Sequence, residues 1–301
     1  MVLESLSLDA ASQTISDCLP AISVFPSLSQ LKLGCQEEDS KLPPNFKALA
    51  PLTALEDLTV SRWDNICWEG GPLLPRITQL QLDSAERVAL DAALPSLQHL
   101  RVEDVGILVI GGQHFQALQL SSLLLQNVLK ELSVSWSQLG SLRELHARFM
   151  GEAVVSGTAE LSAHTNLTAL SLGWGGGEGA YDSACVLLQA APRSLRSLSL
   201  EEWPDDRVPP PALAGLTQLT SLQCGSLAVI PHLSSLGHLQ EVRFRFNSAA
   251  DLSVHDLAYL SEVTGLRRLR FGLRLAEAGF RTRCFKVLHK HLPDGCEVEQ
   301  A

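Results

Sequence analysis

A glycine-rich run at positions 173–179 is the segment of this sequence whose residue types most readily suggest chemistry. It reads GWGGGEG, follows a predicted strand and precedes a predicted helix. A glycine-rich turn in that context can bind phosphate through backbone N–H groups at a helix N-terminus. The run fits neither G-x-G-x-x-G nor the P-loop pattern, and no Lys-Ser or Lys-Thr pair follows it. We therefore interpret it as a flexible loop.

The histidines and cysteines form no recognisable catalytic or metal-binding set. His289 and His291 are two positions apart on a predicted helix, where they point to different sides and cannot share an ion. His99 and His146 project from separate predicted strands without a converging cysteine or carboxylate pair. The seven cysteines occur singly, which argues against a disulfide framework or zinc module and for a reducing compartment. We predict no catalytic residue, no metal, no cofactor and no enzymatic activity.

The charge of the chain narrows its partners. The 301 residues carry a formal net charge of −10, which disfavours nucleic acid and anionic membranes as general partners. No segment approaches the ~20 apolar residues of a membrane span, and the first residues lack the features of a signal peptide. The sequence thus predicts a cytoplasmic protein without a membrane span. Its charge is uneven, because residues 266–291 hold eight basic residues and one acid, Glu277.

One apolar spacing recurs along almost the whole chain. The pattern is L-x-x-L-x-L, with other apolar residues replacing some leucines. Eleven clear copies begin at Leu3, Leu28, Leu55, Ile77, Leu97, Leu142, Leu167, Leu195, Leu219, Leu239 and Leu266.

One further copy must lie between positions 97 and 142, and two registers compete for it. A start at Leu120 gives the more even spacing, whereas a start at Leu129 keeps a polar residue at the middle position. Both registers remain open. Counting one copy there, twelve repeats start between positions 3 and 266, and the mean period of 263/11 is about 24 residues.

The spacing predicts how the chain folds. Alternation at the fourth and sixth positions indicates a short strand with one buried face. If each connecting segment brings the chain back to the same side, successive strands stack in parallel. This stacking is needed because no single repeat can bury its own core. Longer repeats leave room for helices over residues 181–190, 255–263 and 276–291. The short units beginning at Ile77 and Leu219 have room only for turns or one tight helical turn.

The repeated L-x-x-L-x-L units resemble the leucine-rich-repeat superfamily. That family usually places asparagine three positions after the sixth-position leucine, where this chain has Ala11, Gln36, Trp63 and Ala85, and only Asn247 fits. The resemblance is therefore to the irregular intracellular repeats of plant, algal and F-box-associated proteins. It implies an α/β solenoid with a parallel sheet on the concave face and short helices and turns on the convex face. It also implies a non-catalytic scaffold or adaptor that binds a protein partner; the alternatives are a ubiquitin-ligase substrate-recognition subunit and an axonemal or cytoskeletal protein.

The pattern predicts one solenoid domain over residues 1–301, closed by a capping helix and strand at 276–301. The first repeat begins at Leu3 without a polar lid. An exposed apolar end is a liability in a solenoid, so we expect that the chain is a fragment or lacks an upstream cap or F-box.

The third, fifth and seventh positions of each strand should face the concave surface. Strands lie about 4.8 Å apart in a sheet, so four arginines of the last two repeats should cluster: Arg243, Arg245, Arg268 and Arg270. Such a cluster suits an acidic or phosphorylated protein partner. We expect that changing all four arginines to serine weakens binding of the partner without lowering thermal stability. We also expect the chain to be a monomer. A second candidate set, of mixed charge, comprises His99, Arg101, Glu144, His146 and Arg148.

Five tryptophans fall just after predicted strands or in the following loops. Core or loop-anchoring roles are the first interpretation, and anchors of an interface are the second. These residues are Trp63, Trp68, Trp136, Trp174 and Trp203.

Overall fold

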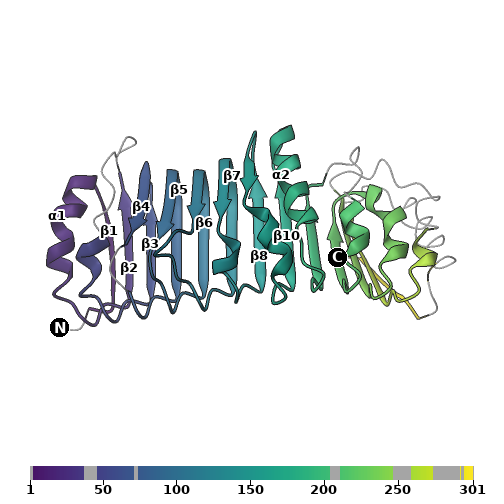
Figure 1. Ribbon diagram of the computed structural model, residues 1–301, viewed down its shortest axis with the longest axis horizontal. Coiled ribbons are helices and arrows are strands. Elements are labelled where there is room, and N and C mark those ends of the chain that lie inside the picture. The colour runs from purple at the N-terminus through teal and green to yellow at the C-terminus, as the bar shows by residue number, and fades with distance from the viewer. Residues whose placement is uncertain are drawn as a thin grey trace.

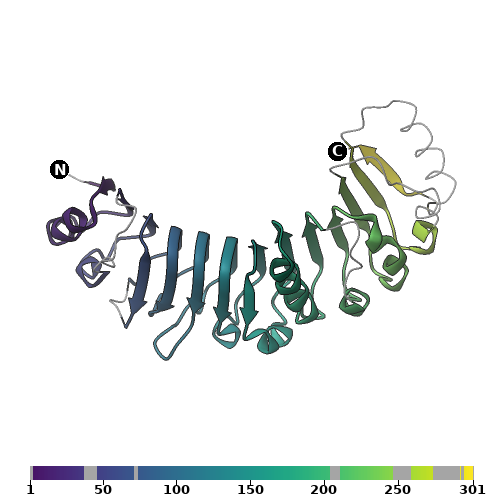
Figure 2. The ribbon, with the colours of Figure 1, turned by 90° about the horizontal axis from the view of Figure 1, so that it is seen from above.

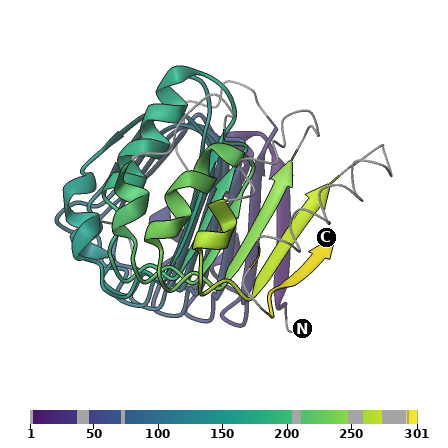
Figure 3. The ribbon, with the colours of Figure 1, turned by 90° about the vertical axis from the view of Figure 1, so that its right-hand side faces the viewer.

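The computed structural model is an open, curved solenoid (Figures 1 and 2). It describes residues 3–36, 46–70, 74–203, 211–246, 259–273, 292 and 295–300. Seen from above, the strands follow the inner side of an arch whose two ends carry the chain termini, and the helices lie on its outer side (Figure 2). The end-on view shows the same separation, with strands on one side and helices on the other (Figure 3).

A parallel sheet runs through all the described repeats. Its main path follows the order β1-β2-β3-β5-β6-β7-β8-β10-β11-β12-β13-β14-β15, with β4 beside β5 and β9 beside β7. The strands are β1 (Ser5–Ala10), β2 (Gln30–Cys35), β3 (Asp57–Ser61), β4 (Asn65–Glu69), β5 (Gln79–Asp91), β6 (His99–Ile110), β7 (Ser122–Val134), β8 (Glu144–Phe149), β9 (Val154–Ser156), β10 (Ala169–Trp174), β11 (Ser197–Glu201), β12 (Ser221–Cys224), β13 (Glu241–Phe246), β14 (Arg268–Leu273) and β15 (Glu297–Gln300).

Strand register confirms the predicted repeat. Leu80 of β5 pairs with Leu100 of β6, and Leu82 pairs with Val102, so the fourth and sixth positions of successive repeats stack. These side chains are at most 1% exposed. Because every repeat adds one strand in the same register, the chain is a leucine-rich-repeat solenoid.

The structure also decides between the two registers of the sixth repeat. Leu100 and Val102 of β6 pair with Leu123 and Leu125 of β7, so the concave strand belongs to the copy that begins at Leu120. Leu129 is 44% exposed and does not begin a concave strand. Leu132, which suggested the other register, belongs to the second half of β7.

That second half reveals a feature that the sequence reading missed. In β5, β6 and β7 the chain turns a corner and continues as a second strand, so Val88, Leu108 and Leu132 form a second buried row. β4 and β9 extend this layer at its two sides. The expectation that the unit beginning at Ile77 holds only turns is therefore wrong.

Each corner lies at the eighth position of its repeat. Ser84, Asp104 and Asn127 adopt left-handed φ angles of 55°, 51° and 56°, a conformation that bends the strand locally. The Asn127 side-chain amide donates a 2.7 Å hydrogen bond to the Asp104 carboxylate, which ties two successive corners together. The ninth position then turns inward, so Val105 and Val128 are buried where the wider family places asparagine. An apolar contact replaces the usual polar one.

Helices complete the other repeats. The α-helices are α1 (Ser12–Ile22) and α2 (Glu178–Gln189), and the 3-10 segments are Phe46–Leu49, Trp136–Gln138, Thr158–Ala163, Pro211–Gly215, Leu227–Ser235 and Tyr259–Glu262. The helix expected over residues 181–190 is confirmed, beginning three residues earlier. Residues 259–262 of the helix expected over 255–263 form a 3-10 turn, and the helix expected at 276–291 lies outside the described residues. None of the described helices is long and apolar enough to cross a membrane.

Tryptophans fill the space between the concave strands and the outer segments. Trp63, Trp68 and Trp136 are at most 1% exposed, so these three are core residues and not interface anchors. Trp68 stacks on Phe46 with ring centroids 4.4 Å apart.

Candidate functional site

The glycine-rich run is a packing device. A Cβ on Gly177 would lie 2.2 Å from the Gly151 carbonyl oxygen, and one on Gly179 would lie 2.8 Å from the Cα of Glu152. The Ala180 N–H, one of the amides that a phosphate would need, already donates to the Gly151 carbonyl at 2.9 Å. These glycines therefore let two backbone segments approach closely, in place of the flexible loop that we expected.

The histidines, cysteines and carboxylates of the described residues do not converge on a metal site. No three histidine, cysteine or carboxylate side chains of that part of the chain are close enough to hold an ion. No disulfide joins two cysteines of that part of the chain, and Cys35 and Cys224 are buried. The positions that remain as candidates are therefore those of the concave face.

The arginine cluster (Arg243, Arg245, Arg268 and Arg270) has two members on β13 and two on the adjacent β14. Arg243 pairs in register with Arg270 across β13 and β14, and Arg270 pairs with Glu299 of β15. The Arg270 guanidinium lies 2.7 Å from the Glu299 carboxylate and 3.2 Å from that of Glu241.

Other members of the cluster are neutralised less completely. Arg268 lies 3.9 Å from Glu297 and 3.8 Å from Glu299, and Arg243 lies 3.6 Å from Glu241. Arg245 is exposed beside a small hollow of about 160 Å³ and forms no ion pair with another described residue. Three carboxylates thus offset four guanidinium groups, and the cluster is much less positive than its sequence suggests.

The mixed-charge set lies near the middle of the arch. Arg101 donates a 2.7 Å hydrogen bond to Glu103, and Arg148 donates one of 2.8 Å to Glu202. His99 and Glu144 both stand opposite Ser122, one on each side of β7. Two members of the set, Arg101 and Arg148, are thus paired with acids outside it, whereas Glu144 has no ion pair among the described residues.

Burial lowers the pKa of the His146 imidazole below its ordinary value of 6.5. The Glu201 carboxylate opposes this shift, whereas the Arg148 guanidinium adds to it. His146 is therefore uncharged near neutral pH, and the positive charge of this region comes from its arginines.

Leu124 is a functional candidate that the sequence reading left out. It stands in register between Arg101 of β6 and His146 of β8, at the fifth position of its repeat, which faces the concave side. Every other fifth position from Ser7 on β1 to Glu299 on β15 is polar or charged. We call Arg101, Leu124 and His146 the central site. The sequence does show an apolar residue at the fifth position of the repeat that begins at Leu120. Because the other repeats have a polar residue there, Leu124 was an argument against this register, which is the correct one.

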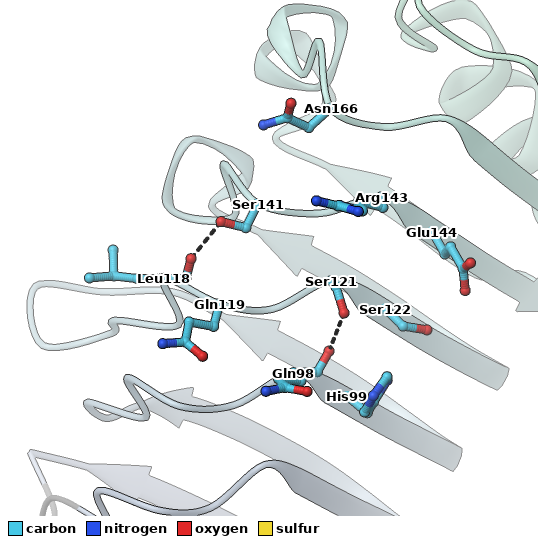
Figure 4. Close-up of a pocket in the computed structure, with 10 residues that line it drawn as sticks. All are labelled: Gln98, His99, Leu118, Gln119, Ser121, Ser122, Ser141, Arg143, Glu144 and Asn166. Atoms are coloured by element: carbon cyan, nitrogen blue, oxygen red, sulfur yellow. Dashed lines mark hydrogen bonds between the residues drawn. The ribbon is translucent and has the colours of Figure 1, made fainter.

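Two hollows meet at this part of the sheet. The concave hollow, of about 260 Å³, is lined by Asp57, Thr59, Gln81, Arg101 and Leu124 among others. Burial raises the pKa of the Asp57 carboxyl group. The rim hollow, of about 480 Å³, lies where β6, β7 and β8 begin (Figure 4). The rim hollow is lined by Gln98, His99, Leu118, Gln119, Ser121, Ser122, Ser141, Arg143, Glu144 and Asn166.

Comparison with known proteins adds little to this geometry. No protein-family model matches the chain, and no curated protein matches it. Among solved structures, it is similar to an internalin, InlF, from Listeria monocytogenes, with a TM-score of 0.36 and 15% sequence identity. The match covers 93% of this chain and 63% of the internalin chain, so the present chain spans less than two thirds of that protein. The assignment to the leucine-rich-repeat fold therefore stands on the sheet and its register.

Proposed function

We propose that the chain is a non-catalytic protein-binding module that holds a partner on its concave face around the central site. The observation that carries this proposal is Leu124, a half-buried apolar side chain in an otherwise polar row between Arg101 and His146. Binding energy at protein interfaces concentrates in a few apolar or arginine anchors surrounded by polar contacts. Leu124 and its two neighbours supply that arrangement, and the adjoining hollows give a partner room to enter.

The arginine cluster is proposed as a second contact on the same face. Its remaining positive charge is greatest at Arg245, which has no ion-pair partner among the described residues. An acidic or phosphorylated segment of the partner would complement it. The other two routes to a function, ubiquitin-ligase substrate recognition and an axonemal or cytoskeletal role, agree with a concave binding face but have no separate structural support. The lack of a disulfide among the described cysteines agrees with a reducing, cytoplasmic setting.

The proposal is tested by affinity capture from an extract of native cells, quantified by mass spectrometry. Leu124→Asp should lower the recovery of specific partners about tenfold or more, because it places a charge in the apolar contact. Val154→Asp is the control, since Val154 is an apolar residue of β9 that is 59% exposed and does not line the concave hollow. Recovery of the same proteins at equal yield by Leu124→Asp and wild type, with both chains folded by circular dichroism, contradicts the proposal.

A further inference from the structure

The two hollows are neighbours on the sheet. The concave hollow and the rim hollow share His99 and Ser122, and we call the two together the groove, which reaches from Leu124 on the concave face to the loop before β7. The far end carries a second apolar side chain, Leu118, which is 66% exposed (Figure 4). The groove thus crosses the starts of β6, β7 and β8, with an apolar residue at each end.

Some polar side chains between these ends form hydrogen bonds within the protein, and others do not. Ser121 and Ser141 donate to the carbonyls of Gln98 and Leu118, and Asn166 donates to the Gly140 carbonyl. These bonds hold the loops in place. In contrast, the side-chain amides of Gln98 and Gln119 form no hydrogen bond with any residue that the structure describes.

The arginine and the glutamate of the rim hollow, Arg143 and Glu144, form no ion pair with another described residue, whereas Arg101 in the concave hollow is paired with Glu103. Arg143 is exposed, and its guanidinium has no carboxylate partner within the described part of the chain. Its backbone carbonyl, however, accepts from the N–H groups of Thr168 and Ala169 and so fixes its place at the start of β8. The residue is therefore held by its backbone while its charge remains available.

The chemistry of these groups selects an occupant. A glutamine amide offers both a donor and an acceptor, which match the N–H and C=O groups of a peptide backbone. Only an extended segment leaves those backbone groups free, because a helix has already bonded them to each other. A guanidinium adds a planar site for a carboxylate.

We propose, building on the concave-face function above, that this groove binds an extended segment of a partner protein that carries one acidic residue between apolar ones. Gln98 and Gln119 bond its backbone, Arg143 binds a carboxylate, and apolar side chains of the segment contact Leu118 and Leu124. The site therefore recognises an unfolded stretch or a terminal tail and not a folded surface.

The test uses the full chain and a display library of random dodecapeptides. The enriched peptides are synthesised with a fluorescent label, and their Kd values are measured by fluorescence polarisation. We expect them to share an acidic residue flanked by apolar ones. Arg143→Glu and Leu118→Asp should each weaken their binding about tenfold.

Two matched controls separate the groove from general effects of charge. Arg196 occupies the same second repeat position as Arg143, is exposed, and its carbonyl accepts from Thr220 and Ser221 in the equivalent way. Arg196→Glu should leave Kd unchanged, as should Val154→Asp, which matches Leu118→Asp in exposure and charge.

Several results would overturn the inference. These are equal Kd values for Arg143→Glu and Arg196→Glu, selected peptides without an acidic residue, no enrichment of any peptide, and concentration-dependent dimers that Leu118→Asp dissociates. The last result would place a second copy of the chain in the groove. If the peptides respond to Leu124→Asp but not to Arg143→Glu or Leu118→Asp, the extended groove fails while the concave-face function stands. If they respond to none of the three, both fail.

Discussion

The groove and the arginine cluster lie on the same sheet, but they differ in how many of their polar groups are already paired. In the cluster, Arg270 lies 2.7 Å from Glu299 and 3.2 Å from Glu241. In the groove, Gln119 and Arg143 have no side-chain partner among the described residues. The density of basic residues in the sequence predicts a binding site at the arginine cluster. The lack of ion-pair and hydrogen-bond partners in the structure favours the groove instead. A binding site is better identified by unpaired groups than by the density of charge.

Reversing a charge should lower stability in the arginine cluster and leave it unchanged in the groove. Glu299→Lys removes the nearest carboxylate of Arg270 and adds a third cation beside Arg268, so we expect a loss of about 1 kcal/mol in the free energy of unfolding. Glu144→Lys, on β8, removes a carboxylate that has no ion pair in the described structure and should leave stability unchanged. Thermal unfolding of both variants checks the pair. Equal losses would show that the comparison between the regions is wrong.

Replacing different arginines of the cluster should change the free energy of unfolding by different amounts. Arg270→Ser breaks two ion pairs and should cost about 0.5 kcal/mol, less at high salt because half-exposed charges are screened. Arg245→Ser should cost nothing. The expectation that all four arginines can be replaced without a loss of thermal stability is therefore revised for Arg270. Urea unfolding of the two variants at low and high salt measures the difference, and a loss of equal size in both would contradict it.

The main sheet could be predicted because the same spacing returns in every repeat. The second strands could not be predicted with equal ease, although their signal is present. Val88 and Leu90 alternate in the fourth repeat, and Leu108 and Ile110 do so in the fifth. In the sixth repeat one extra residue before Leu132 shifts the register, and the resulting second row was mistaken for a competing first strand. A local insertion is enough to hide a period that is clear elsewhere.

The candidate site was predicted only in part, for a related reason. Alternation placed Arg101, His146 and the arginine cluster correctly on the concave face. The neutralising role of Glu299 depends on where the last strand adds to the sheet, which lies outside any single repeat. Leu118 and Gln119 belong to an irregular loop before β7, and no periodic pattern says which way such a loop turns.

His146 offers the smallest effect and the most specific test of the central site. Its folded pKa is lowered, mainly by burial, so below pH 6.5 the unfolded chain takes up a proton more readily than the folded chain. Stability should therefore fall as the pH drops through 6.5 and stop falling below the folded pKa. His146→Gln cannot take up that proton, so wild type should lose stability relative to His146→Gln between about pH 8 and about pH 5.5. Urea unfolding of both proteins across this range measures the difference. Parallel curves would mean that the imidazole is as well hydrated in the folded chain as in the unfolded one, and the central site would then be an open, wet surface unsuited to an apolar anchor at Leu124.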